Sequence, residues 1–169
     1  MENETRLPRN GKEFLLFLGV ISIISVNIIA PIIMAFEFGG MTKEVYMMAL
    51  KTMPFIWICV VLLEGLLVEP LVEKLVGKFT KKTDSFNAHI LFNILFSVTI
   101  LSFLLTIIGT WIGTRTISLD PIRHLFLNWP RNFFIALWVE TLIAQPIARF
   151  VMKKFHEKQS NSIAKTEKI

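Results

Sequence analysis

Two glutamates within strongly apolar stretches are the residues of this chain that offer chemistry. Glu64 and Glu140 are each flanked by aliphatic side chains. A carboxyl group in such surroundings can bind a cation or relay a proton, but its charged form costs at least about 2.5–3.5 kcal/mol at the centre of a bilayer. We therefore treat Glu64 and Glu140 as candidate proton or cation sites, whose neutral, protonated form must also be considered.

The segment that contains each glutamate occurs twice in the chain. Residues 64–79 align without a gap on residues 140–155, and the same offset carries Pro54 onto Pro130. The matched pairs are Glu64 and Glu140, Leu66 and Leu142, Pro70 and Pro146, Lys78 and Lys154, and Phe79 and Phe155. We interpret the chain as a tandem duplication of a unit with one such glutamate.

Four long apolar stretches must position these acids, and they raise the hydrophobic fraction of the chain to 53%. They cover residues 14–36, 54–68 with extensions, 90–113 and 133–152. Each can reach the roughly 20 residues that a helix needs to cross about 30 Å of hydrocarbon. A soluble four-helix bundle needs a polar stripe on every helix, and the stretch 90–113 contains no charged residue. The pattern predicts an all-α membrane protein with four transmembrane helices.

Two spans in each unit require the second copy to insert in the same orientation as the first, so we expect two parallel-oriented two-helix repeats. The predicted segments are an N-terminal tail (1–13), the first repeat (14–79), a basic linker (80–88), the second repeat (89–155) and a C-terminal tail (156–169). The first apolar stretch is longer than the 7–15 residues of a typical signal-peptide core. We therefore expect it to remain as a span.

Basic residues are concentrated in the two tails and the middle loop. They are Arg6, Arg9, Lys12, Lys74, Lys78, Lys81, Lys82, Arg149, Lys153, Lys154, Lys158, Lys165 and Lys168. Because Lys and Arg accumulate on the cytoplasmic side of membrane proteins, both termini are predicted to be cytoplasmic. This bias accounts for the net charge of +5, so no nucleic-acid partner is expected. The same lysines favour anionic lipid at the cytoplasmic face of the lipid bilayer.

Short interfacial helices are predicted in the two outer loops. In the first loop, Thr42 follows Gly39 and Gly40 as an N-cap for a helix over 43–53. In the second, Asp120 caps and Pro121 begins a helix. Its apolar stripe contains Ile122, Leu125, Phe126 and Trp129. The alternative for this second loop is an ordered loop with an aromatic anchor.

The expected depth of both acids follows from two prolines. If Pro54 and Pro130 mark the outer boundaries of their spans, each glutamate lies ten residues further in. At about 1.5 Å per residue that is roughly 15 Å, close to the middle of the bilayer. The supporting polar residues available on the neighbouring spans are Ser22, Ser25, Asn27, Asn93, Ser97, Ser102 and Thr106.

Two interpretations of the acids stay open. In one, the pair binds a cation or relays a proton between the halves. In the other, each acid hydrogen-bonds a neighbouring span and fixes the packing. Interhelical hydrogen bonds in membranes contribute only about 0.6 kcal/mol on average, so they can hold a neutral acid but not a charged one.

Prolines and small residues predict the local form of the spans. Kinks are expected at Pro31, Pro70 and Pro146, because proline removes a backbone donor and frees the carbonyl four residues earlier. Gly109 and Gly113 form a GxxxG pair, the pattern that lets two membrane helices approach closely. Ala136, Ala144 and Ala148 share a stripe with Glu140, which predicts a close helix neighbour at that acid.

Other chemistry finds little support in the sequence. The chain has no nucleotide-binding glycine loop and no Cys/His cluster, and its three histidines are scattered. We therefore expect no metal, no cofactor and no catalysed reaction.

With its repeated motif laid out, the chain resembles the bacterial membrane-protein family catalogued as domain of unknown function 2798. The resemblance rests on Ser22, Ser25 and Asn27, on Trp129-Pro130-Arg131-Asn132-Phe133, and on Pro146. It covers both halves, but the first departs from the motif at Met53-Pro54-Phe55. The resemblance implies two spans per unit and a bacterial cytoplasmic membrane, and it implies no activity.

These observations predict a small membrane protein with two candidate functions. One is a transporter or permeability factor whose mid-membrane glutamates titrate. Since four spans enclose little room, it is expected to be a homo-oligomer. The alternative is a non-transporting assembly or regulatory partner with structural glutamates.

Overall fold

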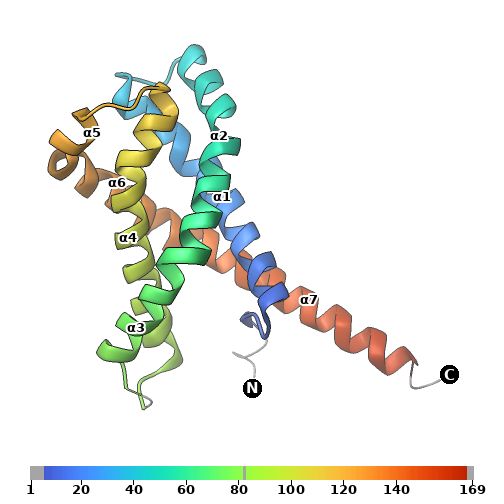
Figure 1. Cartoon of the computed structure of the whole chain (residues 1–169). Coiled ribbons are helices and arrows are strands. Elements are labelled where there is room, and N and C mark those ends of the chain that lie inside the picture. The colour runs from blue at the N-terminus through green and yellow to red at the C-terminus, as the bar shows by residue number, and fades with distance from the viewer. Residues whose placement is uncertain (1–5, 82, 167–169) are drawn as a thin grey trace.

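The computed structural model describes residues 6–81 and 83–166, and within these ranges the regular elements are helices (Figure 1). They are α1 (Gly11–Glu37), α2 (Lys43–Leu63), η2 (Glu64–Val68), α3 (Glu69–Phe79), α4 (Phe86–Thr114), α5 (Asp120–Arg123), α6 (Leu125–Val139), η3 (Glu140–Ala144) and α7 (Gln145–Thr166). Of the predicted cytoplasmic basic residues, Lys82 and Lys168 lie outside the described ranges.

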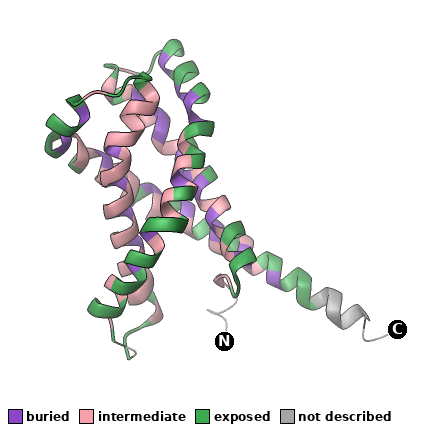
Figure 2. Ribbon diagram, in the orientation of Figure 1, coloured by how far each residue is buried: buried purple, intermediate pink, exposed green. Residues whose placement is uncertain are grey.

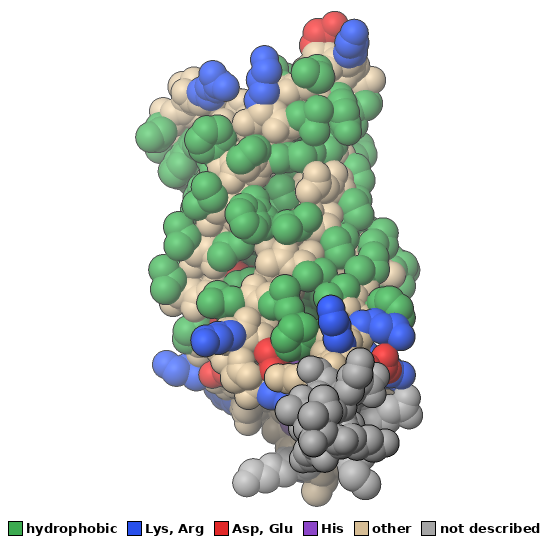
Figure 3. Space-filling model, turned by 90° about the vertical axis from the view of Figure 1, so that its right-hand side faces the viewer, with side chains coloured by type: hydrophobic (Ala, Val, Ile, Leu, Met, Phe, Trp, Pro, Cys, Tyr) green, Lys and Arg blue, Asp and Glu red, His purple; other side chains and the backbone are tan. Residues whose placement is uncertain are grey.

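Four continuous helical segments are long and apolar enough to cross a membrane. They are Gly11–Glu37, Lys43–Phe79, Phe86–Thr114 and Leu125–Ser160. Figure 3 shows a band of hydrophobic side chains between two ends at which Lys and Arg gather. The prediction of an all-α chain with four candidate membrane helices is therefore confirmed by length and composition.

The long helices form two packed pairs, and each pair also contacts the other. Helix α1 packs on α2, and it also contacts α6, η3 and α7. Helix α4 packs on α6, and it also contacts α2, η2 and α3. The start of α1, the described residues 80–81 and 83–85 between α3 and α4, and the far part of α7 lie toward one end of the molecule. The other connections lie at the opposite end (Figure 1). We call the first end the basic end and the opposite end the loop end.

Buried residues form a stripe along one face of α1 and of α4. On α1 the buried residues Leu18, Ser22, Val26 and Ala30 recur every four positions. On α4 the buried residues Ile94, Val98, Ser102 and Thr106 do the same. Residues four apart lie on one face of a helix, so each helix turns one stripe inward. The rest of α1 is of intermediate exposure or exposed, and the rest of α4 is almost all of intermediate exposure (Figure 2).

The connection between α1 and α2 differs from the prediction. Thr42 is the N-cap, and its hydroxyl accepts a hydrogen bond from the Val45 N–H at 3.2 Å, as expected. However, α2 then runs through Pro54 to Leu63 without a break, so the separate helix over 43–53 was wrong. A proline within a helix removes one backbone hydrogen bond, and membrane helices tolerate that loss.

The connection between α4 and α6 does contain a short helix, but its start was mispredicted. Helix α5 has Leu119 as its N-cap, and Asp120 is already its first helical residue. There the carboxylate still favours the helix, because negative charge is stabilised near a helix N-terminus. Helix α6 begins at Leu125 and contains Pro130. Neither Pro54 nor Pro130 therefore marks the end of a helix.

Candidate functional site

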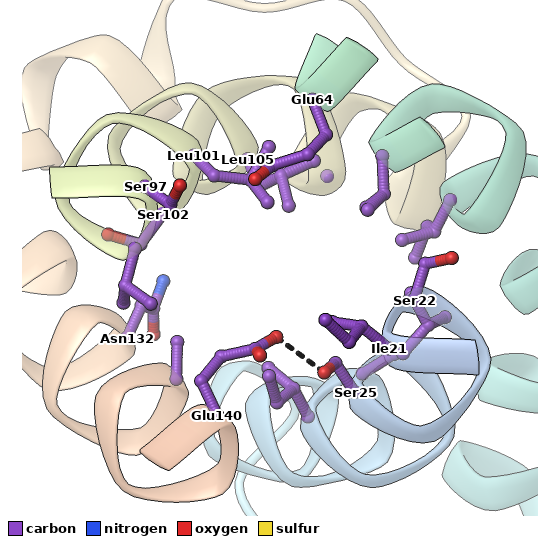
Figure 4. A pocket seen from close by; sticks show the side chains of 18 of the residues that line it. Ile21, Ser22, Ser25, Glu64, Ser97, Leu101, Ser102, Leu105, Asn132 and Glu140 are labelled. Atoms are coloured by element: carbon purple, nitrogen blue, oxygen red, sulfur yellow. Dashed lines mark hydrogen bonds between the residues drawn. The ribbon is translucent and has the colours of Figure 1, made fainter. Parts of the chain in front are cut away.

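A cavity of about 180 Å³ lies between the four long helical segments. Its lining begins near Phe14 and Gln145 toward the basic end and reaches Glu37 and Gly113 toward the loop end. Figure 4 looks into this space and shows side chains of both halves around it. We call it the central cavity.

Glu64 and Glu140 face the central cavity from opposite walls (Figure 4). Each is the first residue of a π-helical turn, Glu64 of η2 and Glu140 of η3. The two acids singled out from the sequence therefore come together around one space, although they belong to different helical segments.

Glu140 is tied to the first helix. Its Oε1 atom accepts a hydrogen bond of 2.5 Å from Oγ of Ser25. Ser25 lies near the middle of α1, about 21 Å along the helix from Gly11 at about 1.5 Å per residue. Glu140 therefore lies beside the middle of α1, while Pro54 and Pro130, from which the depth of the acids was predicted, lie inside helices.

Glu64 has different surroundings. Its Oε2 atom is buried and has no hydrogen-bond partner among the described residues. The Ser97 hydroxyl points toward this carboxyl group from α4 (Figure 4). Since a buried acceptor without a donor loses the hydrogen bonds that water supplied, Glu64 is the acid with unused capacity for a ligand.

The π-turns bring a second pair of polar residues to the cavity wall. The Glu69 N–H donates to the Glu64 carbonyl, and the Gln145 N–H donates to the Glu140 carbonyl. This five-residue spacing defines a π-turn and stacks residue i+5 above residue i, whereas the 3.6-residue α-helix would turn it away. Glu69 and Gln145 both line the cavity, and an α-helical periodicity does not predict this.

Proline accounts for the position of both π-turns. Pro70 and Pro146 lie in the first turns of α3 and α7, directly after the π-helical segments. Proline has no N–H for the carbonyl four residues before it, and local π geometry is one way in which membrane helices satisfy the freed groups. Pro31, by contrast, lies within the uninterrupted helix α1.

Most of the predicted supporting residues line the central cavity. They are Ser22, Ser25, Asn93, Ser97, Ser102 and Thr106. Asn27 does not: its side chain is exposed and donates to the Ile23 carbonyl of its own helix at 2.7 Å. It lies two residues beyond Ser25, which turns it to another face of α1.

The glycine pair of α4 was also misinterpreted. A Cβ atom built on Gly109 or Gly113 would meet nothing within 4 Å. Both residues line the cavity instead, so the predicted close helix contact at GxxxG was wrong. Ala144 and Ala148 are fully buried, in agreement with the close neighbour expected beside Glu140.

Comparison with known proteins identifies part of the chain. Residues 85–156 match the family model described as "Domain of unknown function (DUF2798)". The match confirms the family expected from the sequence, for this segment. Neither a curated protein nor a solved structure matches the chain.

The DUF2798 segment contains a polar network that links α4 to α6. The indole N–H of Trp129 donates to Oγ of Ser102 at 3.1 Å, and the Asn132 amide donates to Oγ1 of Thr106 at 3.2 Å. Asn132 is buried, and Arg131 donates to its Oδ1 atom. The Trp129–Phe133 motif therefore forms hydrogen bonds toward the loop end of the cavity.

Outside the DUF2798 segment, the described residues of the first half make one contact of this kind. The Trp57 indole donates to Oγ of Ser22 at 3.0 Å, which links α2 to α1 as Trp129 links α6 to α4. The position that aligns with Asn132 is Ile56, which cannot donate. The two halves of the cavity wall are therefore not chemically equivalent.

A buried contact outside the cavity joins the DUF2798 segment to the N-terminal region. Nε2 of His156 lies 2.9 Å from Oε2 of Glu13, and both residues are buried. The pair connects α7 to the start of α1. Sequence reasoning treated the histidines as scattered, because no short spacing relates positions 13 and 156.

The ionisable side chains that line the cavity are acidic. Glu37, Glu64, Glu69 and Glu140 line the cavity, and none of the described lining residues is basic. Among the described residues there is no group of three His, Cys, Asp or Glu that could hold a metal ion. The carboxyl groups of the lining offer oxygen atoms that can take up a proton or bind a cation.

Proposed function

We propose that this protein is an integral membrane protein that takes up a proton or a small cation at Glu64 and Glu140 and passes it along the central cavity. The observation that carries the proposal is that both carboxyl groups face one cavity from opposite walls. The buried Oε2 atom of Glu64, which has no hydrogen-bond partner among the described residues, supports it further, because a cation can bind this oxygen and a proton can neutralise the buried charge.

The charge of the cavity supports a positively charged cargo. Its lining residues include four glutamates and no described basic residue. Coulomb attraction strengthens as the effective dielectric constant falls, so a cation between these walls is favoured over an anion. The proposal includes no catalysed reaction.

We infer that the two halves descend from one two-helix unit and insert in the same orientation. The buried positions support this, because they recur at the offset that relates the glutamates. The pairs are Leu18 and Ile94, Ser22 and Val98, Val26 and Ser102, Ala30 and Thr106, Val68 and Ala144, and Val72 and Ala148. A π-turn at each glutamate adds a backbone feature to the same relationship.

We place the protein in a bacterial cytoplasmic membrane with both termini in the cytoplasm. In support, the start of α1, the described residues 80–81 and 83–85 and the far part of α7 lie toward one end (Figure 1). The basic residues of these segments make that end the cytoplasmic side by the positive-inside rule. Anionic lipid is the expected partner of the same lysines.

A homo-oligomer stays part of the proposal, but the cation site does not depend on it. It was expected because four spans enclose little room, whereas the central cavity is lined by a single chain. Light scattering on the detergent-solubilised protein, corrected for bound detergent, distinguishes a monomer from an oligomer.

The second candidate function is a non-transporting assembly partner with structural glutamates. The Ser25–Glu140 hydrogen bond favours it, because this contact joins α1 to η3. A neutral carboxyl group that accepts this hydrogen bond would fix the packing of α1 against η3 and would transport neither a proton nor a cation. Glu64, with its unpartnered oxygen, is not explained in this way.

Proton uptake by reconstituted protein separates the two candidates. Liposomes that contain the protein and a pH-sensitive dye are given a potassium diffusion potential, negative inside. We expect the interior to acidify with the wild-type chain, and we expect Glu64→Gln and Glu140→Gln to reduce the rate to that of protein-free liposomes. Glu73→Gln is the matched control, because Glu73 is exposed and does not line the cavity.

Two results would contradict the proposed proton transport. If the folded Glu64→Gln/Glu140→Gln variant conducts protons like the wild type, the glutamates do not carry them. If the wild type matches protein-free liposomes, proton transport is excluded under this driving force. Loss of the monodisperse, helical state in the double variant favours the structural candidate.

A further inference from the structure

The walls of the central cavity are apolar apart from a few polar groups. Isoleucines and leucines of α1 and α4 make up much of the lining: Ile21, Ile29, Ile33, Leu101 and Leu105. Such a wall offers a hydrated inorganic ion few oxygen atoms in exchange for its water. The wall instead resembles ligand pockets, which are mostly apolar with a small number of polar groups that fix orientation.

The size of the cavity bounds the size of its occupant. Its volume is about 180 Å³, and an apolar protein cavity of about 150 Å³ holds one benzene molecule. A ligand with one small ring or a short branched alkyl group therefore fits.

Most hydrogen-bonding groups beside the two acids already have partners. Ser25 donates to Glu140, and Ser22 donates to the Leu18 carbonyl while it accepts from Trp57. Glu64 Oε2 is left without a donor among the described residues. An ionised carboxyl group only accepts hydrogen bonds, so an occupant that satisfies this atom must bring an N–H or O–H group.

We propose that the central cavity binds a protonated primary or secondary amine with a small apolar body. The ammonium group lies between Glu64 and Glu140 and donates to Glu64 Oε2, while the apolar body packs against Ile29, Ile33 and Leu105. This inference rests on the proposed function and names the class of cation that the cavity takes. The charge, the hydrogen-bond donor and the apolar body are three separable requirements.

Four probes separate these requirements on the unmodified protein. Phenethylammonium has all three features, methylammonium lacks the apolar body, benzyltrimethylammonium lacks the donor, and benzenesulfonate has the opposite charge. Titration calorimetry on the purified full-length chain in detergent at pH 7 keeps the primary amines protonated. Because each of the other three probes lacks the apolar body, the hydrogen-bond donor or the positive charge, we expect phenethylammonium to bind at least about tenfold more tightly than any of them.

A variant pair tests whether this binding occurs at Glu64. Glu64→Gln should weaken phenethylammonium binding by at least about tenfold, since the loss of a charge-assisted bond costs that much. Glu73→Gln should leave it unchanged. If the heat came only from partition of the probe into micelles, the two variants would give equal heats. That result would overturn the proposal. The four-probe comparison needs no variant, so it decides even if Glu64→Gln does not fold.

Failure of this inference is distinguishable from failure of the proposed function. If proton uptake depends on the glutamates but phenethylammonium does not bind selectively, the proposed function stands and the amine-binding site is wrong. Selective binding that depends on Glu64, without proton uptake, retains the amine site and overturns the proton carrier. If phenethylammonium and benzyltrimethylammonium bind with equal affinity, the proposed hydrogen bond from the ammonium group to Glu64 Oε2 is wrong.

Discussion

Oγ of Ser25 and Oε1 of Glu140 lie 2.5 Å apart although 115 positions separate the two residues in the chain. The contact joins the middle of the first helix to the start of the π-turn in the last helical segment. Glu64, the matching acid of the first half, has a buried oxygen without such a partner. The two acids therefore face one cavity with different hydrogen-bonding states.

Ser25→Ala should destabilise the folded protein. The substitution removes the donor to Glu140, and a lost buried hydrogen bond that leaves its acceptor unsatisfied costs about 1–2 kcal/mol. The free energy of unfolding is measurable by titration of the protein from mild detergent into sodium dodecyl sulfate.

Asn27→Ala is the control for that measurement. Asn27 is on the same helix, but it is exposed and bonds only to the Ile23 carbonyl. Its removal should change the unfolding free energy much less than the removal of the Ser25 hydroxyl. Equal losses for the two variants would contradict the assigned role of Ser25.

Asn132→Ala should weaken the contact between α4 and α6. Asn132 is buried and donates to Thr106, and it accepts from Arg131. Its truncation removes these hydrogen bonds and leaves Thr106 and Arg131 each short of a partner, at about 1–2 kcal/mol. The same unfolding titration measures the loss, with the exposed residue Asn87 truncated as the control. Unchanged stability in Asn132→Ala would show that the network is dispensable.

The contact between Glu13 and His156 should act as a unit. Glu13→Gln and His156→Gln each disturb a buried pair, so each should lower the thermal midpoint in detergent. Interacting residues are non-additive, and the double variant should therefore lose less than the two single losses together. Strict additivity would mean that the 2.9 Å contact carries no coupling.

Deletion of Leu142 should be tolerated by the fold. A π-turn holds one residue more than an α-turn, so removal of an exposed residue within η3 restores an α-helix and keeps the register of the flanking segments. Deletion of Leu104 within α4 rotates all later residues of that helix and should abolish folding. Size-exclusion chromatography and circular dichroism compare the two deletions, and equal behaviour would contradict the π-turn.

The spans and the two acids were predictable from sequence because each depends on local composition. A charge-free stretch such as 90–113 leaves little alternative to a buried or membrane helix, and the repeat drew attention to Glu64 and Glu140. Glu69 and Gln145 were missed since the α-helical period places them away from those acids. Only the π-turn brings them to the same wall.

Interior prolines and small residues misled the sequence reasoning for a related reason. Pro54 and Pro130 were predicted to mark the outer boundaries of their spans, yet both lie within helices, since one missing hydrogen bond does not end a helix that packs along its length. Gly109 and Gly113 had a pattern typical of helix contacts but face a cavity. Partner and facing direction depend on tertiary packing, which a local pattern does not specify.

The central claim is that Glu64 and Glu140 face a water-accessible cavity inside membrane-embedded helices. Single cysteines at each acid, and at the exposed positions Leu66 and Leu142, can be tested in proteoliposomes after Cys59→Ser removes the native thiol. Reaction with a cationic, membrane-impermeant methanethiosulfonate reports water access, because the thiolate is the reactive form. We predict that Glu64→Cys and Glu140→Cys react while Leu66→Cys and Leu142→Cys do not. Fast reaction at the two leucine positions, or none at the two acids, would contradict the account.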